Sequence, residues 1–204
     1  MEALLMSVGS GWVSGIRPYF MVFLLGVAGR IFDLDQVPAV LERTDVLVIA
    51  GILLVVDFAA DKIPYFDSFW DQLNLVVRPI AGAALGALVG GETDTTTAII
   101  GAVLGGGAAL GAHAAKATTR AVVNVSPEPV SNVVVSGVED VSALAMGVLT
   151  IALPVVAGVI GVVLVGVGLY AVYRIHRSYR RLRERLRIAR ERRAPVGPDE
   201  MPGV

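Results

Sequence analysis

The chain has 204 residues, of which 55% are hydrophobic, and its mean hydropathy is +0.71. A soluble domain of this length needs polar residues to cover its surface, so this composition excludes an ordinary soluble protein and predicts a membrane protein. The net charge of −1 conceals a segregation of charge, because ten of the seventeen basic residues lie between Arg174 and Arg193, and the lack of cysteine excludes disulfides and thiolate metal sites.

Six segments are apolar enough to be predicted as membrane-spanning helices, because about 20 residues are needed to cross roughly 30 Å of hydrocarbon. They cover residues of about 4–28, 46–60, 73–90, 97–115, 133–153 and 155–173. Runs such as GAALGALVGG form helices poorly in water, but in lipid their small residues let helix backbones approach closely. The expected fold is an all-α, polytopic membrane protein with six transmembrane helices in three hairpins, followed by a cytoplasmic basic helix.

The loops predict how these helices are oriented. The loop RIFDLDQVPAVLERTD after the first segment and the loop GGETDTTT after the third are acidic on balance. The opposite side carries Lys62, Lys116, Arg120 and the arginine-rich tail, and loops rich in Lys and Arg stay in the cytoplasm. Both termini are therefore expected to be cytoplasmic.

The sequence also predicts an internal repeat, over residues of about 7–62 and 68–117. Arg17-Pro18 opens an apolar run in the first copy and Arg78-Pro79 opens one in the second. The first copy ends in FAAD and the second in HAAK, so that Asp61 aligns with Lys116, and we expect these two residues to form an ion pair. Internal repeats of this kind are common in transporters.

Polar residues recur on the predicted helices at steps of three and four, which puts each set on one helix face. A charge at membrane depth is costly, so these groups are expected to turn inward, pair with one another or line a wet cavity. Ser7, Ser10 and Ser14 belong to one such stripe. The predicted substrate or ion pathway consists of Arg17, Asp57, Asp61, Lys62, Asp67, Asp71, Asn74, Arg78, His113, Lys116, Arg120, Asn132, Glu139 and Asp140.

Two prolines, Pro18 and Pro79, each follow an arginine within a long apolar stretch. Proline removes a backbone donor, so both helices are expected to kink or break there. Broken helices beside buried charge form the binding sites of many transporters. The alternative is a kink that serves packing alone, with each arginine reaching the lipid headgroups.

Other side chains support more than one interpretation. His113 either relays protons or makes a structural hydrogen bond. The carboxylates of Asp57, Asp61, Asp67 and Asp71 suit Ca²⁺ or Mg²⁺, but no known loop spacing accompanies them, so metal binding stays open. No catalytic residue and no cofactor is predicted. The aromatic residues of the turn after the second segment are expected to anchor it at the lipid headgroups: Tyr65, Phe66, Phe69 and Trp70.

The arginine-rich tail carries an apolar seam at helical spacing, formed by Ile175, Tyr179, Leu182, Leu186 and Ala189. A short coiled coil or an amphipathic helix on anionic lipid would fit, and we favour lipid because so many arginines repel in a parallel coil. The expected domains are a transmembrane bundle over 1–173, this basic helix over 174–193 and a disordered tail over 194–204. Nucleic acid is not expected as a partner, and a homo-oligomer stays open.

Several short motifs together resemble a family of bacterial integral membrane proteins that is catalogued only as a domain of unknown function. They are DFAADKIPYFDSFWD, Arg78-Pro79, HAAK with Arg120, Asn124, SPEP, Ser131-Asn132 and Glu139-Asp140. The resemblance covers about Gly15 to Leu153 and leaves the basic tail uncovered. It implies a helical protein of the bacterial plasma (inner) membrane and supplies no activity.

Three functions are compatible with these features. The first is a transporter or channel for a small ion or polar solute through a charge-lined interior, because ionisable groups lie at membrane depth beside two Arg-Pro steps. The second is a non-transporting scaffold or partner subunit whose charged faces dock lipid or another membrane protein. The third, an intramembrane enzyme acting on lipid through Asp57, His113 and Glu139, lacks a nucleophile or metal motif.

Overall fold

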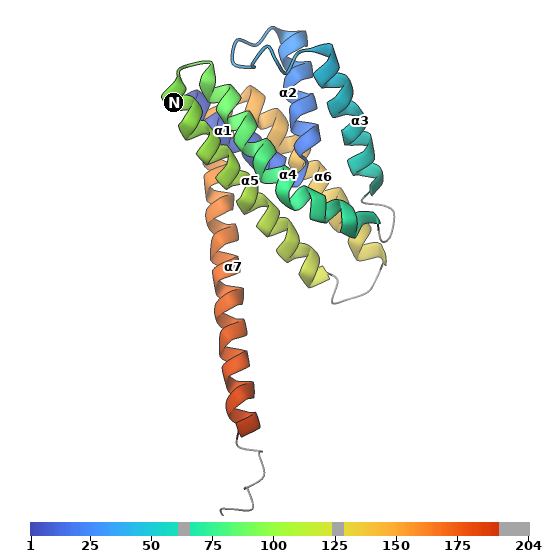
Figure 1. Ribbon diagram of the computed structural model, residues 1–204, viewed down its shortest axis with the longest axis vertical. Helices are drawn as coiled ribbons and strands as arrows, with labels where there is room; N and C mark the ends of the chain where they lie inside the picture. The colour runs from blue at the N-terminus through green and yellow to red at the C-terminus, as the bar shows by residue number, and fades with distance from the viewer. Residues whose placement is uncertain (61–65, 124–128, 192–204) are drawn as a thin grey trace, which may run out of the picture. The chain divides into compact units, whose positions relative to one another are not determined.

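The computed structural model describes the backbone of residues 1–60, 66–123 and 129–191, and the side chains of residues 1–60, 70, 72–119, 134–171, 173, 174, 177 and 180. Seven α-helices lie in these ranges: α1 (Glu2–Ile16), α2 (Pro18–Phe32), α3 (Thr44–Ala60), α4 (Phe66–Gly91), α5 (Thr95–Val123), α6 (Pro129–Ala152) and α7 (Pro154–Glu191) (Figure 1). The chain divides into two compact units, residues 1–169 and residues 170–204.

Four of the helices are long and apolar enough to cross a membrane, through Gln72–Gly91, Thr95–Thr119, Val134–Ala152 and Pro154–Ala171. They confirm the expected all-α membrane class. The first predicted span is instead divided into α1 and α2, which have 15 residues each. At 1.5 Å per residue such a helix is only about 22 Å long, which is too short to cross roughly 30 Å of hydrocarbon.

The chain reverses direction between α1 and α2, as their contacts with α6 establish. Gly9 lies against Thr150, Arg17 against Asp140, and Leu24 against Gly147. Successive residues of α1 therefore contact earlier residues of α6, and successive residues of α2 contact later ones again. The two short helices form a hairpin (Figure 1), and its tip is Arg17, the single residue between the end of α1 and the start of α2.

Proline chemistry explains the tip of this hairpin. Pro18 has no backbone N–H and disfavours helical geometry at the residue before it, and Arg17 takes an extended conformation with φ −143° and ψ 85°. The Arg17 N–H donates to the Val13 carbonyl at 2.7 Å, and its own carbonyl accepts from the Met21 N–H at 3.3 Å. One residue therefore ends α1 and begins α2.

The expected break is found at Pro18 and not at Pro79, because α4 continues through Pro79 from Phe66 to Gly91. Contacts on both sides of Pro79 favour the continuous helix: Asn74 reaches α3, and Gly82 lies against Gly105 of α5. The two Arg-Pro steps on which the predicted repeat was based therefore have different backbone structures.

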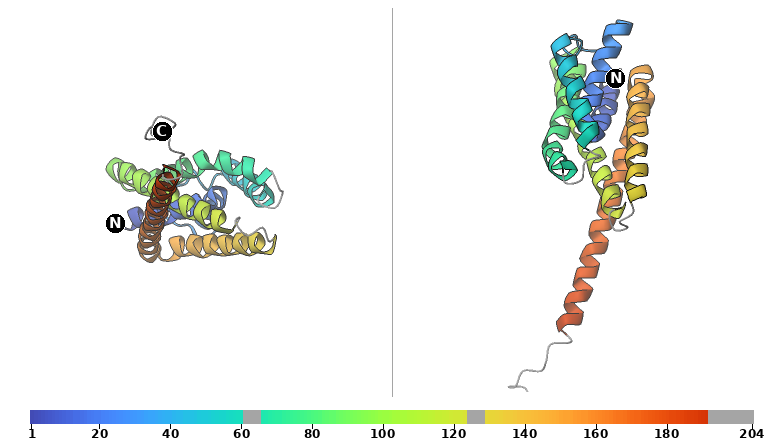
Figure 2. Two further views of the ribbon diagram at one scale, coloured as in Figure 1. Left: turned by 90° about the horizontal axis from the view of Figure 1, so that it is seen from below. Right: turned by 90° about the vertical axis from the view of Figure 1, so that its right-hand side faces the viewer.

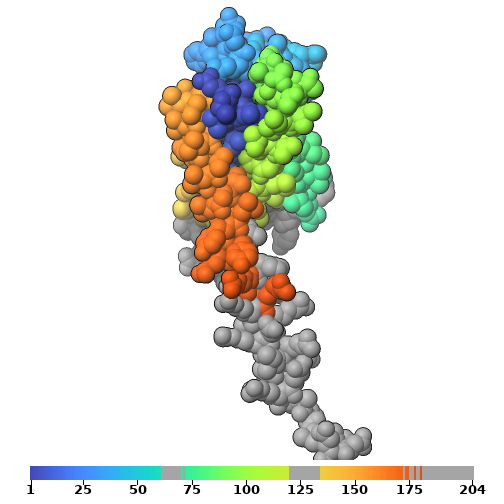
Figure 3. Space-filling model, turned by 90° about the vertical axis from the view of Figure 1, so that its left-hand side faces the viewer, coloured from blue at the N-terminus to red at the C-terminus, as the bar shows by residue number. Residues whose placement is uncertain are grey.

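Helix α1 lies at the centre of unit 1, buried from Met6 to Ile16. Both views in Figure 2 place it with α4 and α5 on one side and α6 on the other, and in Figure 3 its first turns show at the surface between α5 and α7. Glycines allow this close packing. A Cβ atom on Gly11 would overlap the carbonyl oxygen of Gly105, and one on Gly86 would overlap that of Gly101. The small residues thus act as the sequence predicts.

The two ends of unit 1 are also defined by packing. Leu5 of α1 contacts Gly158 near the start of α7, whereas Ala115 of α5 lies beside Gly168, farther along α7. The N-terminus and Leu169 therefore lie at opposite ends of unit 1. Asp94, at the same end as the N-terminus, caps α5 by accepting hydrogen bonds from the Thr97 hydroxyl at 2.6 Å and the Thr97 N–H at 3.0 Å, and these bonds lower the pKa of its carboxyl.

The tail belongs to unit 2, which covers Tyr170–Val204, and the predicted boundary at residue 174 stays a prediction. Its backbone is helical as far as Glu191, and Arg177 Nη1 donates to the Tyr173 hydroxyl at 3.3 Å. The side chains of the predicted apolar seam and residues 192–204 lie outside the described part of the chain. The predicted lipid contact and the disordered end stay predictions.

Candidate functional site

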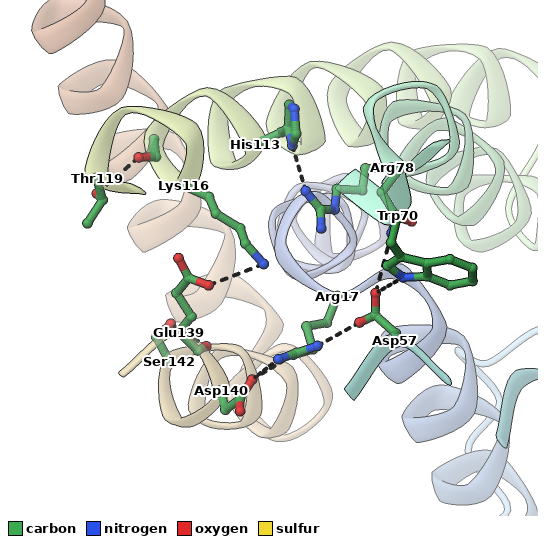
Figure 4. Close-up of polar contacts among 12 residues, drawn as sticks. Arg17, Asp57, Trp70, Arg78, His113, Lys116, Thr119, Glu139, Asp140 and Ser142 are labelled. Carbon is green, nitrogen blue, oxygen red and sulfur yellow. Dashed lines mark hydrogen bonds and ion pairs between the residues drawn. The ribbon is translucent and has the colours of Figure 1, made fainter. Parts of the chain in front are cut away.

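A group of polar side chains meets where the tip of the α1–α2 hairpin approaches α3, α4, α5 and α6 (Figure 4). This polar cluster consists of Arg17, Asp57, Trp70, Asn74, Arg78, His113, Lys116, Glu139 and Asp140. Its α4, α5 and α6 members other than Trp70 fall within the segments that are apolar enough to cross a membrane. The protein therefore buries charged side chains at a depth where a charge exposed to lipid would be energetically costly.

Arg17 bridges two carboxylates on different helices. Its Nη1 is 2.7 Å from Asp57 Oδ2, its Nε is 2.6 Å from Asp140 Oδ1, and its Nη2 also contacts Asp140. The planar guanidinium suits such a double contact because its five donors point in fixed directions. The guanidinium carbon also lies 5.5 Å from the centre of the Phe58 ring. Only 4% of Arg17 is exposed, so the hairpin tip is anchored inside the protein.

Asp57 is the buried carboxylate of α3, with 1% of its surface exposed. Besides Arg17, it accepts hydrogen bonds from Trp70 Nε1 at 2.8 Å and from Asn74 Nδ2 at 3.4 Å. Three donors of this kind satisfy an ionised carboxylate and replace its water. Asp57 therefore joins α3 to α4 and to the hairpin tip.

Trp70 belongs to the polar cluster, a role that the sequence analysis, which expected it at the lipid headgroups, did not predict. It points into the cluster and its ring lies 6.3 Å from that of Tyr19. The signal that would have found it is spacing, because Trp70, Asn74 and Arg78 follow one another at intervals of four on α4.

Arg78 and His113 join α4 to α5, with 2.9 Å between Arg78 Nη1 and His113 Nδ1. Arginine carries only donors, so Nδ1 accepts and the ring proton lies on Nε2. This geometry supports the structural hydrogen bond among the two roles considered for His113, since a proton on Nδ1 would break the contact. The described partner of His113 is thus the cationic side chain of Arg78.

Lys116 pairs with Glu139 of α6, with 3.2 Å between Nζ and Oε2. The predicted partner of Lys116, Asp61, lies outside the described residues, so that pairing stays a prediction. The lysine side chain is 3% exposed and the glutamate 11%, so the pair is nearly withdrawn from solvent. Among the described side chains of the cluster, three basic residues (Arg17, Arg78 and Lys116) accompany three carboxylates (Asp57, Glu139 and Asp140).

The remaining predicted pathway residues are distributed differently. Asp61 and Lys62 lie outside the described residues. The backbones of four others lie on helices, while their side chains are outside the described set: Asp67, Asp71, Arg120 and Asn132. The serine stripe of α1 serves helix packing, because the hydroxyls donate to backbone carbonyls such as those of Ala3, Gly86 and Ser10.

The described side chains include no group of three His, Asp or Glu residues that could hold a metal ion. Asp57, the described member of the proposed cation site, is occupied by donor groups. An apolar groove between α2 and α3 is lined by Phe23, Leu47, Ile52 and their neighbours, and none of its lining residues belongs to the polar cluster.

Comparison with known proteins agrees with the resemblance noted in the motifs. Neither the curated proteins nor the solved structures provide a match to this chain. A family model matches residues 4–174, which include all of unit 1 except the first three residues and therefore the entire polar cluster. The chain belongs to this family, described as a domain of unknown function (DUF4126).

Proposed function

We propose that this protein moves a small ion or polar solute across a membrane, with the polar cluster as its gate. The observation that carries the proposal is the position of Arg17, at the tip of a hairpin of two short helices, between the buried Asp57 and the partly exposed Asp140. Short helices that meet at buried charge are how many transporters build a site inside the membrane. Ion pairs between different helices suit a gate, because a substrate can replace one partner of the pair and so release one helix from the other.

The packing supports a five-pass topology in which α1 and α2 enter the membrane and return to the same side. Helix α3 has 17 residues, about the shortest length that spans a bilayer, and α3 to α7 then cross the membrane, so that the N-terminus and Leu169 lie on opposite sides. The positive-inside rule puts the tail in the cytoplasm, where it meets anionic lipid of the plasma membrane. This topology differs from the expectation that both termini are cytoplasmic, which assumed that residues 4–28 form a single span.

Cysteine labelling tests this topology without background, because the chain has no cysteine. A Glu2→Cys variant in intact spheroplasts is expected to react with a membrane-impermeant maleimide. An Asp199→Cys variant is expected to react only after the membrane is permeabilised. Protection of both cysteines until permeabilisation would contradict the five-pass topology and restore the six-span one.

Transport itself is tested in proteoliposomes with gradients of protons, Na⁺, K⁺, nitrate or acetate. The purified protein is expected to dissipate at least one gradient, and Asp140→Asn to change that rate by about tenfold or more, because it alters the exchangeable partner of Arg17. Asp94→Asn, at the exposed cap of α5, is the matched control and should leave the rate unchanged. Failure to move any of these species, in a protein whose thermal unfolding is cooperative, would overturn the proposal.

A second function, that of a non-transporting scaffold, is favoured by one observation: Arg17 and Lys116 form ion pairs with carboxylates on other helices. Lys116→Glu or Glu139→Lys alone should lower the free energy of unfolding by about 3 kcal/mol or more, because each leaves two like charges buried. The double exchange should regain most of this loss, since the pair is restored in reverse.

Flux through the double variant distinguishes the two functions. If the pair acts as a gate, flux through the double variant is expected to stay low, because the substrate then meets a carboxylate on α5 in place of the lysine. Wild-type flux in the double variant would show that the pair only holds α5 to α6. Thermal unfolding of all four proteins in nanodiscs provides the stability measurement.

A further inference from the structure

Helices α2 and α3 lie side by side (Figure 1), and the apolar groove between them follows one face of α3. The α3 residues that line it recur at steps of three and four from Thr44 to Val56, which is the spacing of a single helix face. The twelve steps from residue 44 to residue 56, at 1.5 Å each, give the groove a length of about 18 Å. One leaflet contributes about half of the roughly 30 Å of hydrocarbon in a bilayer, so the groove is about as long as one leaflet is deep.

The groove is open along its length. Val48, Ile52 and Val55, which line it, are 54%, 59% and 69% exposed. Its floor includes Gly51, where a Cβ atom would lie 3.3 Å from the ring of Phe23, so the aromatic ring packs directly on the backbone of α3. Exposed apolar side chains of a membrane protein face the lipid tails, and a groove of this length fits one acyl chain.

The polar end of the groove lies where the loop joins α2 to α3. Arg30 of the last turn of α2 is exposed, and its Nη2 donates to the Thr44 hydroxyl oxygen at 3.0 Å. Within residues 1–60, all of which are described, Arg30 has no carboxylate partner, and the ion pair of the loop joins Arg43 to Asp45 at 2.8 Å. The Thr44 hydroxyl also keeps its own proton to donate. A guanidinium and a hydroxyl donor side by side suit the oxygens of a phosphate.

The loop around this polar end is acidic. Residues 30–45 contain two arginines and four carboxylates, which are Asp33, Asp35, Glu42 and Asp45. The Glu42 carboxylate lies against Gly29, the neighbour of Arg30, with its Oε1 2.7 Å from the position of a Cβ atom there. A phosphate at Arg30 therefore has carboxylates around it, which attract a cationic group next to the phosphate and repel additional negative charge.

We infer that the groove between α2 and α3 binds one zwitterionic phospholipid of the phosphatidylethanolamine type. Its phosphate accepts hydrogen bonds from Arg30 and Thr44, its ammonium faces the loop carboxylates, and one acyl chain lies along α3 as far as Val56. The site does not depend on the transport function. It also fits both the five-pass and the six-span topology, because in each of them residues 30–45 lie at a membrane surface.

The test counts the lipid that stays on the protein in a maltoside detergent. A detergent tail can fill the groove but brings no phosphate, whereas in a bilayer some phospholipid always covers it. The full chain is equilibrated with equal amounts of dioleoyl phosphatidylethanolamine and dioleoyl phosphatidylglycerol, washed in the detergent and weighed by native mass spectrometry. We expect about one phospholipid per chain, enriched in phosphatidylethanolamine by about threefold or more, as exposed charge pairs allow.

Variants at exposed positions locate the lipid. Arg30→Gln removes the phosphate donor and should lower the retained lipid by about fivefold or more. Val48→Trp fills the groove and should lower it likewise. The matched controls are Arg43→Gln in the same loop and Ile49→Trp on α3, since Ile49 is 58% exposed and does not line the groove. Both controls should retain as much lipid as the parent protein.

Three results would overturn the site. Equal retention by the parent, Arg30→Gln and Val48→Trp would mean that the lipid is adventitious. Lipid retained in the mixing ratio, or enriched in phosphatidylglycerol, would contradict the zwitterionic headgroup. A dimer without lipid that Val48→Trp separates into single chains would show that a second copy of the chain occupies the groove. Failure of the protein to move any ion in proteoliposomes would overturn transport and leave this lipid site standing.

Discussion

Replacing Arg17 by Gln is expected to lower the free energy of unfolding by about 3–5 kcal/mol. The substitution leaves Asp57, 1% exposed, without the cation that faces it, and a buried uncompensated carboxylate is among the costliest defects in a protein. It also removes the contact that holds the hairpin tip to α6. Thermal unfolding in nanodiscs, followed by circular dichroism, measures the loss.

Two further variants identify the cause. Arg17→Gln with Asp57→Asn should recover part of the loss, because no charge then stays unpaired at that position. Arg30→Gln is the matched control, since Arg30 also lies on the hairpin but is exposed and donates to Thr44 at 3.0 Å. It should change stability by no more than about 0.5 kcal/mol. Equal effects of Arg17→Gln and Arg30→Gln would contradict a structural role for the buried ion pairs.

Replacing Gly105 by Val is expected to destabilise the protein by about 3 kcal/mol or more. Gly105 lies where three helix backbones meet: its own Cβ would overlap the Gly82 carbonyl oxygen of α4, and Gly11 of α1 packs on its other side. No flexible side chain is present there to move aside, so the helices themselves would have to separate. Thermal unfolding and the monodispersity of the purified protein report the effect.

The control for this prediction lies two residues away on the same helix. A Cβ atom on Gly107 would meet nothing within 4 Å, so Gly107→Val adds volume to an open face. Gly107→Ala should be neutral or stabilising, because alanine favours a helix over glycine by up to about 1 kcal/mol. Equal losses from Gly105→Val and Gly107→Val would mean that α5 does not pack through its glycines.

The site residues differ in how well their sequence context predicts them. Asp57, Arg78 and Lys116 are isolated charges in apolar helices, and their cost in lipid predicts that they turn inward. The same argument does not predict which residues they pair with. Lys116 meets Glu139 because α6 passes α5 at that level, and no local spacing encodes which helices become neighbours.

The sequence by itself determined the chemical class of this protein: helical, apolar, built on small residues and carrying balanced charge, since each property follows from composition or from periodicity along one helix. Only the tertiary structure decided that Arg17-Pro18 reverses the chain while Arg78-Pro79 continues a helix. A proline makes a break inexpensive at either step, but contacts with distant helices select the outcome. At Arg17 these contacts are two carboxylates on α3 and α6, and around Pro79 they are the backbone of α5 and the donors that reach Asp57.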